Sequence, residues 1–269
     1  MWTEELFGVK KPIIALLHLD ALPGDPGYCG SMEQVLDHAR ADLTALQDGG
    51  VDGILFANEF SLPYQPVADI AVISAMAYII GSLKPLLRLP FGVNVVKNPI
   101  ATIDLAAATG AGFARSCFSG AYMGEYGLYT SNSGEAVRHR KALDIPGLKL
   151  LYKVNPEADT YLVQRDIQTV TRSILFGGFA DGLCVSGAAA GSEPDDVLLE
   201  KVWQVARPRG VPVFCNTGCR HENVRDKLQR CDAVCMGTAF KKDGVFDGRV
   251  DRARVESFMD IVRDIRAGL

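Results

Sequence analysis

Short apolar runs alternate with longer amphipathic segments along the whole chain. The amphipathic segments have helical spacing, and the first of them opens on Ser31 and closes on Gly49 and Gly50, which are typical start and stop signals. The predicted helices cover 31–50, 66–83, 99–109, 164–177, 194–206, 221–230 and 251–267. The apolar runs between them predict buried strands at 12–19, 53–58, 91–96, 112–117, 148–154, 181–186, 211–216 and 232–237.

This alternation predicts repeated βα units and a parallel sheet. Eight units without a linker-like stretch predict a single domain over residues 1–269, an α/β fold of the closed (β/α)8 TIM-barrel type. An open doubly wound sheet is the alternative. In a barrel of this kind the active site lies at the carboxyl ends of the strands. The polar and small residues that end each apolar run are therefore the candidates for chemistry.

Small residues follow three successive predicted strands. Because glycine lets the backbone approach a ligand closely, and backbone N–H groups can hold an anion, these strand ends predict a phosphate site. Its predicted members are Gly187, Gly191, Asn216, Thr217, Gly218, Gly237, Thr238 and Lys241. The alternative is that the glycines serve only the turns, and that Lys241 is a solvated helix charge.

Acidic and basic candidates end the strands across the ring. The period of two in a strand predicts that His18 and Asp20 share one face, as an acid–base pair or as structural residues. Glu59 follows the run at 53–58 and is the second predicted catalytic carboxylate. Arg115 lies inside an apolar run and must be paired, for example with Asp20 or Glu59, whose pKa it would lower. Lys153 lies at the end of the run at 148–154 and predicts either a base or imine-forming amine with a lowered pKa, or an ion pair with Glu59 or Glu157.

Further polar residues predict substrate contacts. Asn58, Asn94 and Ser186 lie at or near the ends of apolar runs. The segment 118–140 is long and carries Tyr122 among glycines and serines, together with two more tyrosines. Such a loop predicts a lid over a polyhydroxylated ligand, or alternatively an interface between subunits of a homo-oligomer.

Composition and charge narrow the class of protein. A chain of 269 residues with 48% hydrophobic residues can bury a sizeable core, and a net charge of −4 argues against a general nucleic-acid binder. No apolar stretch reaches the roughly 20 residues of a membrane span, and the acidic start lacks the order of a signal peptide. Seven cysteines, most of them in apolar runs, predict a reducing compartment. We therefore expect a cytoplasmic protein without membrane insertion.

The cysteine spacing does not predict a metal site. Cys215 and Cys219, and likewise Cys231 and Cys235, lie four positions apart, whereas zinc sites usually have a CxxC-type spacing. A divalent cation between the predicted carboxylates has no spacing signature. We expect no cofactor.

Ordered motifs over nearly the whole chain give a resemblance. They are "ALLHLDALPGDPGY", "NEFSLPY", "PFGVNVVKNP", "ATGAGFARSCFSGAYMGEYGL", "DGLCVSGAAAGSEP", "VFCNTGCRHENV" and "MGTAFKKDGVFDGRVD". Together they resemble the BtpA-like family, especially its SgcQ-like branch. The resemblance implies a TIM barrel related to the ribulose-phosphate-binding barrels. It also implies pocket positions at Asp20, Asn58, Glu59, Asn94, Arg115, Asn216, Gly218, Gly237 and Lys241.

The resemblance implies two kinds of function. One branch of the family is linked to photosystem I biogenesis, and the SgcQ-like branch to genes of carbohydrate uptake and catabolism. From the residues we expect an enzyme that acts on a phosphorylated sugar or a related small phosphorylated metabolite, as an isomerase, an epimerase or an aldolase-type lyase. The alternatives are a non-catalytic assembly factor, and a hydrolase of a phosphorylated or nucleoside substrate.

Overall fold

The computed structural model describes residues 1–188 and 192–269, and in them eight parallel strands close into a barrel. Each of the eight sequence-predicted strands is confirmed, and each is one to three residues shorter in total than its predicted range. Around the ring the strands are β1 (Ile13–His18), β2 (Gly53–Ala57), β3 (Phe91–Asn94), β4 (Phe113–Ser116), β7 (Lys149–Lys153), β9 (Gly182–Val185), β10 (Val213–Cys215) and β11 (Ala233–Met236). The predicted TIM barrel is thus confirmed, and the open sheet is excluded.

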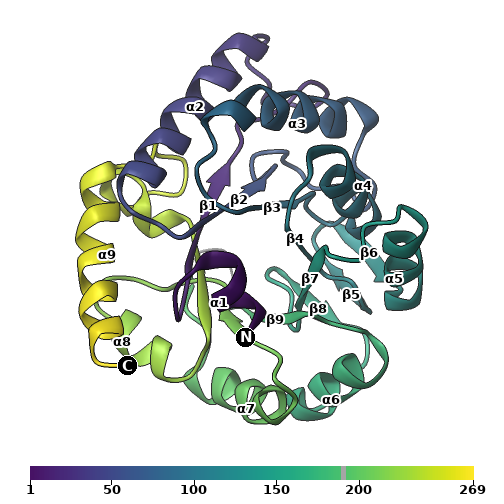
Figure 1. The fold of residues 1–269 in the computed structure, drawn as a ribbon. Coiled ribbons are helices and arrows are strands. Elements are labelled where there is room, and N and C mark those ends of the chain that lie inside the picture. Colours follow the sequence, from purple (N-terminus) through teal and green to yellow (C-terminus); the bar gives the residue numbers. More distant parts are fainter. Residues whose placement is uncertain (189–191) are drawn as a thin grey trace.

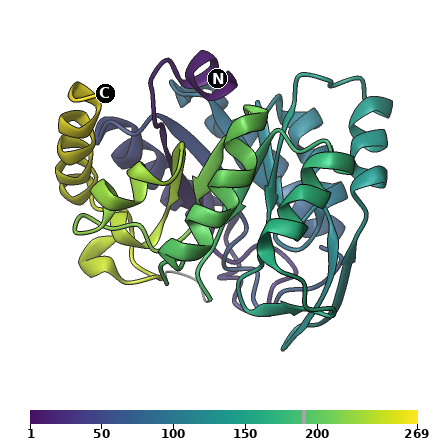
Figure 2. The same ribbon diagram turned by 90° about the horizontal axis from the view of Figure 1, so that it is seen from below.

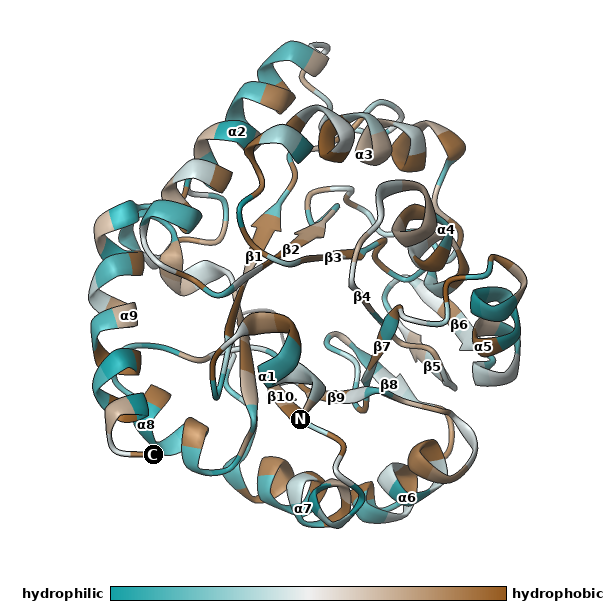
Figure 3. Cartoon of the chain, in the orientation of Figure 1, coloured by the Kyte–Doolittle hydropathy of each residue, from teal (hydrophilic) through white to brown (hydrophobic). Residues whose placement is uncertain are grey.

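Helices surround the strands (Figure 1). They are α2 (Met32–Asp48), α3 (Ile70–Leu83), α4 (Pro99–Thr109), α5 (Ser133–Ala142), α6 (Ile167–Gly177), α7 (Asp196–Ala206), α8 (Val224–Gln229) and α9 (Arg252–Ala267). Short 3-10 turns cover Lys84–Leu86, Arg207–Arg209, Thr238–Phe240 and Lys242–Gly244. Figure 3 shows hydrophobic strands inside helices of mixed polarity, which is the pattern expected when one helix face packs on the barrel.

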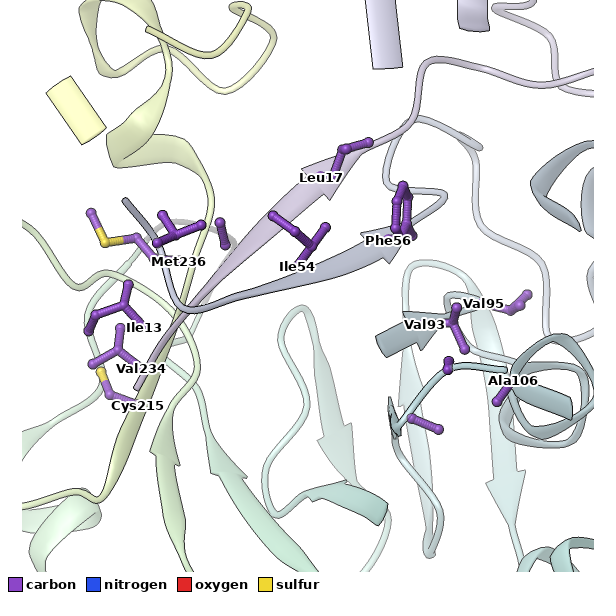
Figure 4. Close-up of a cluster of buried hydrophobic side chains, with 14 of the residues drawn as sticks. Ile13, Leu17, Ile54, Phe56, Val93, Val95, Ala106, Cys215, Val234 and Met236 are labelled. Carbon is purple, nitrogen blue, oxygen red and sulfur yellow. The ribbon is translucent and has the colours of Figure 1, made fainter. Parts of the chain in front are cut away.

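The strands are apolar on both faces because each face has its own core. Along β1, Ile13 and Leu17 belong to the cluster between the barrel and the helices, which Figure 4 shows in part. Ile14 and Leu16 alternate with them and belong to a second cluster that fills the barrel interior. Such double burial explains why the strands appear in the sequence as continuous apolar runs.

The amino end of the barrel is closed by α1 (Trp2–Phe7), a helix that the sequence analysis missed. The ring of Phe7 packs edge-on to Phe113 at 5.7 Å, and Trp2 lies 6.2 Å from Phe214. The Trp2 indole also donates a hydrogen bond of 2.7 Å to the Asp181 carbonyl. Figure 2 shows this helix at the opposite end of the molecule from the teal hairpin that projects beyond the strands. Any ligand site in the barrel therefore lies at its carboxyl end.

That teal segment was predicted to be a loop, and this prediction is wrong. Strands β5 (Gly120–Gly124), β6 (Gly127–Ser131) and β8 (Asp159–Tyr161) form a small antiparallel sheet in the order β6-β5-β8. Tyr122 is buried in this sheet, 4.5 Å from the Tyr161 ring, and its hydroxyl donates to the Ser119 carbonyl. The sheet is an ordered wall beside the barrel mouth.

Candidate active site

The carboxyl ends of the barrel strands surround a cavity with two lobes. Lobe A has a volume of about 300 Å³ and is lined mainly by the ends of β1, β10 and β11 and by the turns that follow them. Lobe B has a volume of about 220 Å³ and is lined by the ends of β3, β4 and β7 and by the small antiparallel sheet. Glu59, Glu157 and Phe246 line both lobes and so mark the boundary between them.

Most sequence-predicted site residues lie at this cavity. Those that line it are His18, Glu59, Asn94, Arg115, Lys153, Asn216, Thr217, Gly218, Gly237 and Thr238. Those that line neither lobe are Asp20, Asn58, Tyr122, Ser186, Gly187 and Lys241. Gly191 lies outside the described residues. The strand-end rule therefore selected the right rim of the barrel but not every side chain on it.

The glycines of the turns after β9 and β10 serve close packing of the chain on itself. A methyl group on Gly187 or Gly218 would overlap the backbone of residues 192–193, and Gly218 also has a left-handed φ of 64°. The N–H of Gly187 donates to the Thr217 hydroxyl at 2.6 Å, which ties the two turns together. Part of the small-residue signal is thus explained by this packing, and only Gly218 of these two glycines reaches lobe A.

Gly237 makes room for the His18 ring. A methyl group at Gly237 would lie 2.8 Å from His18 Cε1 and Nε2. His18 is 5% exposed, and neither ring nitrogen has a hydrogen-bond partner among the described residues. Burial, reinforced by the charges of Lys241 and Arg115, holds the pKa of His18 well below its usual value. The imidazole is therefore neutral at pH 7 and faces lobe A with unused hydrogen-bonding capacity.

A polar chain, buried at Arg115, Ser186 and Asn216, crosses the floor of the site. Arg115 Nη1 donates to Asn216 Oδ1 at 2.8 Å, and Asn216 Nδ2 donates to Ser186 Oγ at 2.8 Å and to Glu157 Oε1 at 3.0 Å. Ser186 Oγ donates to the same Glu157 oxygen, and Lys153 Nζ lies 3.6 Å from it. The predicted partner of Arg115 was Asp20 or Glu59, but the structure supplies the Asn216 amide instead. Such a network fixes the direction of the Glu157 carboxylate.

Glu59 stands at the boundary of the lobes with one tyrosine beside it. The Tyr64 hydroxyl donates to the backbone carbonyl of Glu59 at 2.9 Å and, at a longer 3.3 Å, to Oε1 of the same residue. Burial raises the pKa of Tyr64, so this hydroxyl remains protonated. Glu59 is therefore a carboxylate that faces the cavity and keeps acceptor capacity for a ligand.

Asp20 does not form the predicted pair with His18. Strand β1 ends at His18, so the alternation of a strand no longer applies two residues later. Asp20 instead pairs with Arg249 and with Nδ1 of His38, which lies 2.6 Å from it. Its carboxylate is thereby occupied outside both lobes.

Lys241 is also placed differently from its predicted role at the phosphate site. The side chain is 3% exposed, and its Nζ donates to the Phe246 carbonyl at 2.5 Å. It lies over the rings of Phe60 and Phe246, at 4.8 and 5.3 Å from their centres. Burial lowers the pKa of Lys241 to about 8. The amine therefore stabilises the turn that carries Phe246, and Lys241 lines neither lobe of the cavity.

Two other predicted substrate contacts are structural. Asn58 Oδ1 accepts a hydrogen bond of 2.8 Å from the Val96 N–H, and this amide borders only a small separate cavity of about 20 Å³. Ser186 is 1% exposed and acts within the polar chain described above. Both residues hold neighbouring parts of the chain by hydrogen bonds and line neither lobe.

Several residues of the cavity were not predicted. Glu157 was considered only as a partner of Lys153, although it lies four residues past the end of β7 and borders both lobes. Arg220 and Arg254 line lobe A, and Lys97 lines lobe B. The position of Glu157 just after a strand was a usable signal. Arg254 belongs to helix α9 and not to a strand end, and no local pattern indicates that its long side chain reaches the cavity.

Within 1–188 and 192–269 there is no group of three or more His, Cys, Asp or Glu side chains placed to hold a metal ion. Over the same ranges, no helix is long and apolar enough to cross a membrane.

Comparisons with known proteins place this geometry in a wider group. A model of the BtpA family matches residues 9–264. SgcQ, from the sgc region of Escherichia coli, is 46% identical, and the match covers 98% of this chain and 99% of that protein. The photosystem I biogenesis protein BtpA of Synechocystis sp. is 30% identical over 97% of this chain and 91% of its own length.

A solved structure shares the barrel. Thiamine phosphate pyrophosphorylase from Pyrococcus furiosus superposes with a TM-score of 0.59, and the superposition covers 98% of this chain and 99% of that one. The two sequences are 14% identical, so the similarity is one of fold.

Proposed function

The chain belongs to the BtpA family, and we propose that it is an enzyme that acts on a phosphorylated sugar or a related phosphorylated metabolite by acid–base chemistry. The observation that carries the proposal is the composition of lobe A. Arginines and small-residue turns line it, and the carboxylates of Glu59 and Glu157 stand where it meets lobe B. A phosphate and a proton-transfer group would thus lie in one cavity.

The phosphate would bind between the turns after β10 and β11. Gly218 and Gly237 line lobe A, and Thr217 and Thr238 offer hydroxyls beside them. The guanidinium of Arg254 lines the same lobe, held by a 3.0 Å hydrogen bond from its Nε to the Ala239 carbonyl. Guanidinium and backbone N–H groups are the usual protein partners of phosphate.

The chemistry would take place at the boundary between the lobes. Glu59 would remove a proton from the carbon next to a substrate carbonyl, and the resulting charge would collect on the carbonyl oxygen. Arg115 and Lys153 lie on either side of Glu157 and would stabilise that oxygen. Return of the proton to the same or the neighbouring carbon gives an epimerase or an isomerase.

A second candidate is a non-catalytic assembly factor, because the Synechocystis relative is named for photosystem I biogenesis. The polar chain from Arg115 to Lys153, which is buried at Arg115, Ser186 and Asn216, argues against it. Buried charges reduce stability unless they are well paired, and a binding scaffold has no need of them in its barrel.

A thermal-shift panel tests the proposal. Phosphorylated sugars and their dephosphorylated counterparts are compared, and a ligand at 100 times its Kd should add about 2.7 kcal/mol to the free energy of unfolding. Arg254→Met should abolish the shift, whereas Arg252→Met, on the exposed side of the same helix, should keep it. An unshifted protein across the whole panel would favour the assembly factor. Release of inorganic phosphate or of a free base from a binding compound would favour a hydrolase.

A further inference from the structure

Lobe B differs in chemistry from lobe A, although the two share Glu59, Glu157 and Phe246. Both lysines that line it already have carboxylate partners. Lys97 Nζ lies 2.7 Å from Asp159, in an ion pair whose members are 10% and 4% exposed, and Lys153 pairs with Glu157 at 3.6 Å. A second phosphate would have to compete with these carboxylates. The lobe therefore favours an uncharged group.

Tyrosine rings form one wall of lobe B. Tyr64 and Tyr126 pack edge to face at 5.3 Å, and both line the lobe together with Tyr129. Lys97 Nζ lies 4.9 Å from the centre of the Tyr126 ring, and this cation–π contact holds the ring in place. Tyrosine offers an apolar ring face and a polar edge, and a sugar ring has the matching apolar C–H face and hydroxyl rim.

An unused donor faces the same space. Asn94 ends β3 and is 2% exposed, and its Nδ2 has no hydrogen-bond partner among the described residues. It lines lobe B. A buried donor without a partner reduces stability, so an acceptor supplied by a ligand would account for its presence. Hydroxyl and ring oxygens of a sugar are acceptors of this kind.

We propose that lobe B is a subsite for a neutral sugar ring, and that the substrate is a phosphorylated glycoside that spans both lobes. The inference rests on the proposed function, because it assigns the phosphorylated part to lobe A. The two lobes have volumes of about 300 and 220 Å³, and a ligand that fills both lies in the ordinary size range of ligand sites. Glu59 lines both lobes, and the open-chain form of a reducing sugar supplies the carbonyl that the proposed proton transfer requires.

Isothermal titration of the full chain tests this substrate class. The probes are glucose 6-phosphate, the 6′-phosphates of maltose, cellobiose and lactose, and adenosine 5′-monophosphate. We expect at least one disaccharide phosphate to bind 10-fold or more tightly than glucose 6-phosphate. Tyr126→Ala should bring its affinity down to that of glucose 6-phosphate and leave the latter unchanged. Tyr78→Ala, at an exposed tyrosine of α3, is the matched control and should change neither.

A second variant separates binding from folding. Asn94→Leu replaces an amide whose Nδ2 has no partner among the described residues by an apolar group of similar shape, so the Tm of the free protein should not fall. Its affinity for the disaccharide phosphate should still drop 5-fold or more.

Three results would overturn the inference while the proposed function stands. They are equal affinities for mono- and disaccharide phosphates, an equal loss of both in Tyr126→Ala, and a Tyr126-dependent preference for the nucleotide. Absence of binding by every phosphorylated probe would remove the proposed function as well.

Discussion

The buried amine of Lys241 gives a prediction whose size follows from the structure. Burial lowers its pKa from 10.5 to about 8, so the folded state binds its proton less tightly than the unfolded state. Between pH 8 and 10.5 the unfolded chain carries more protons at this site, and stability contributed by the site rises with pH. The contribution of this site to the free energy of unfolding is therefore about 2 kcal/mol larger at pH 9.5 than at pH 7.

Lys241→Met removes this titration and keeps a side chain of similar length. We expect the free energy of unfolding of the native protein, minus that of the variant, to rise by about 2 kcal/mol from pH 7 to pH 9.5 in urea titrations. Because other groups titrate alike in both proteins, they cancel in the difference. Lys242→Met, which removes the exposed amine of the next residue, is the control and should give a flat difference. A flat or falling difference for Lys241→Met would show that burial does not lower the pKa of this amine.

Three further substitutions test other parts of the site. Gly237→Ala places a methyl group 2.8 Å from the His18 ring, so it should lower the free energy of unfolding by about 1–3 kcal/mol in urea titrations. Asp20→Asn weakens the ion pair with Arg249 and should lower the free energy of unfolding by about 1 kcal/mol. Calorimetry should find the ligand affinity of this variant unchanged. A loss of affinity would show that Asp20 contacts the ligand. Glu59→Gln should reduce kcat by about 10²–10⁴ and leave the Kd of the substrate nearly unchanged, and a variant with full turnover would exclude Glu59 as the base.

The sequence predicted the barrel because its strands are buried on both faces. Ile13 to Leu17 are apolar without interruption, since one set of side chains meets the helices and the other fills the interior. The small sheet escaped prediction for the opposite reason. In strands β5 and β6 only Tyr122 and Tyr129 are buried, and among the described residues these strands pair with each other and with β8. Helix α5 was missed because only Ala136 of its residues is buried, so it has no apolar stripe to detect.

The sequence predicted the site residues that lie on barrel strands, because the strand itself fixes where each side chain lies. Asn94, Arg115 and Lys153 lie on β3, β4 and β7, and the barrel brings them to one cavity. Side chains beyond a strand depend on the path of the loop, which explains why Asp20 turns to Arg249. Long side chains from distant helices, such as Arg254 on α9, depend on the assembled fold and leave no local signal.

The central claim is that a phosphate binds between the turns after β10 and β11, with the rest of the ligand toward Glu59. The most direct test is a crystal structure of the protein soaked with a sugar phosphate that stabilises it in the thermal-shift panel. We expect phosphate density within hydrogen-bonding distance of the backbone at Gly218 and Gly237. Phosphate density in lobe B, or at a site outside the barrel mouth, would contradict it.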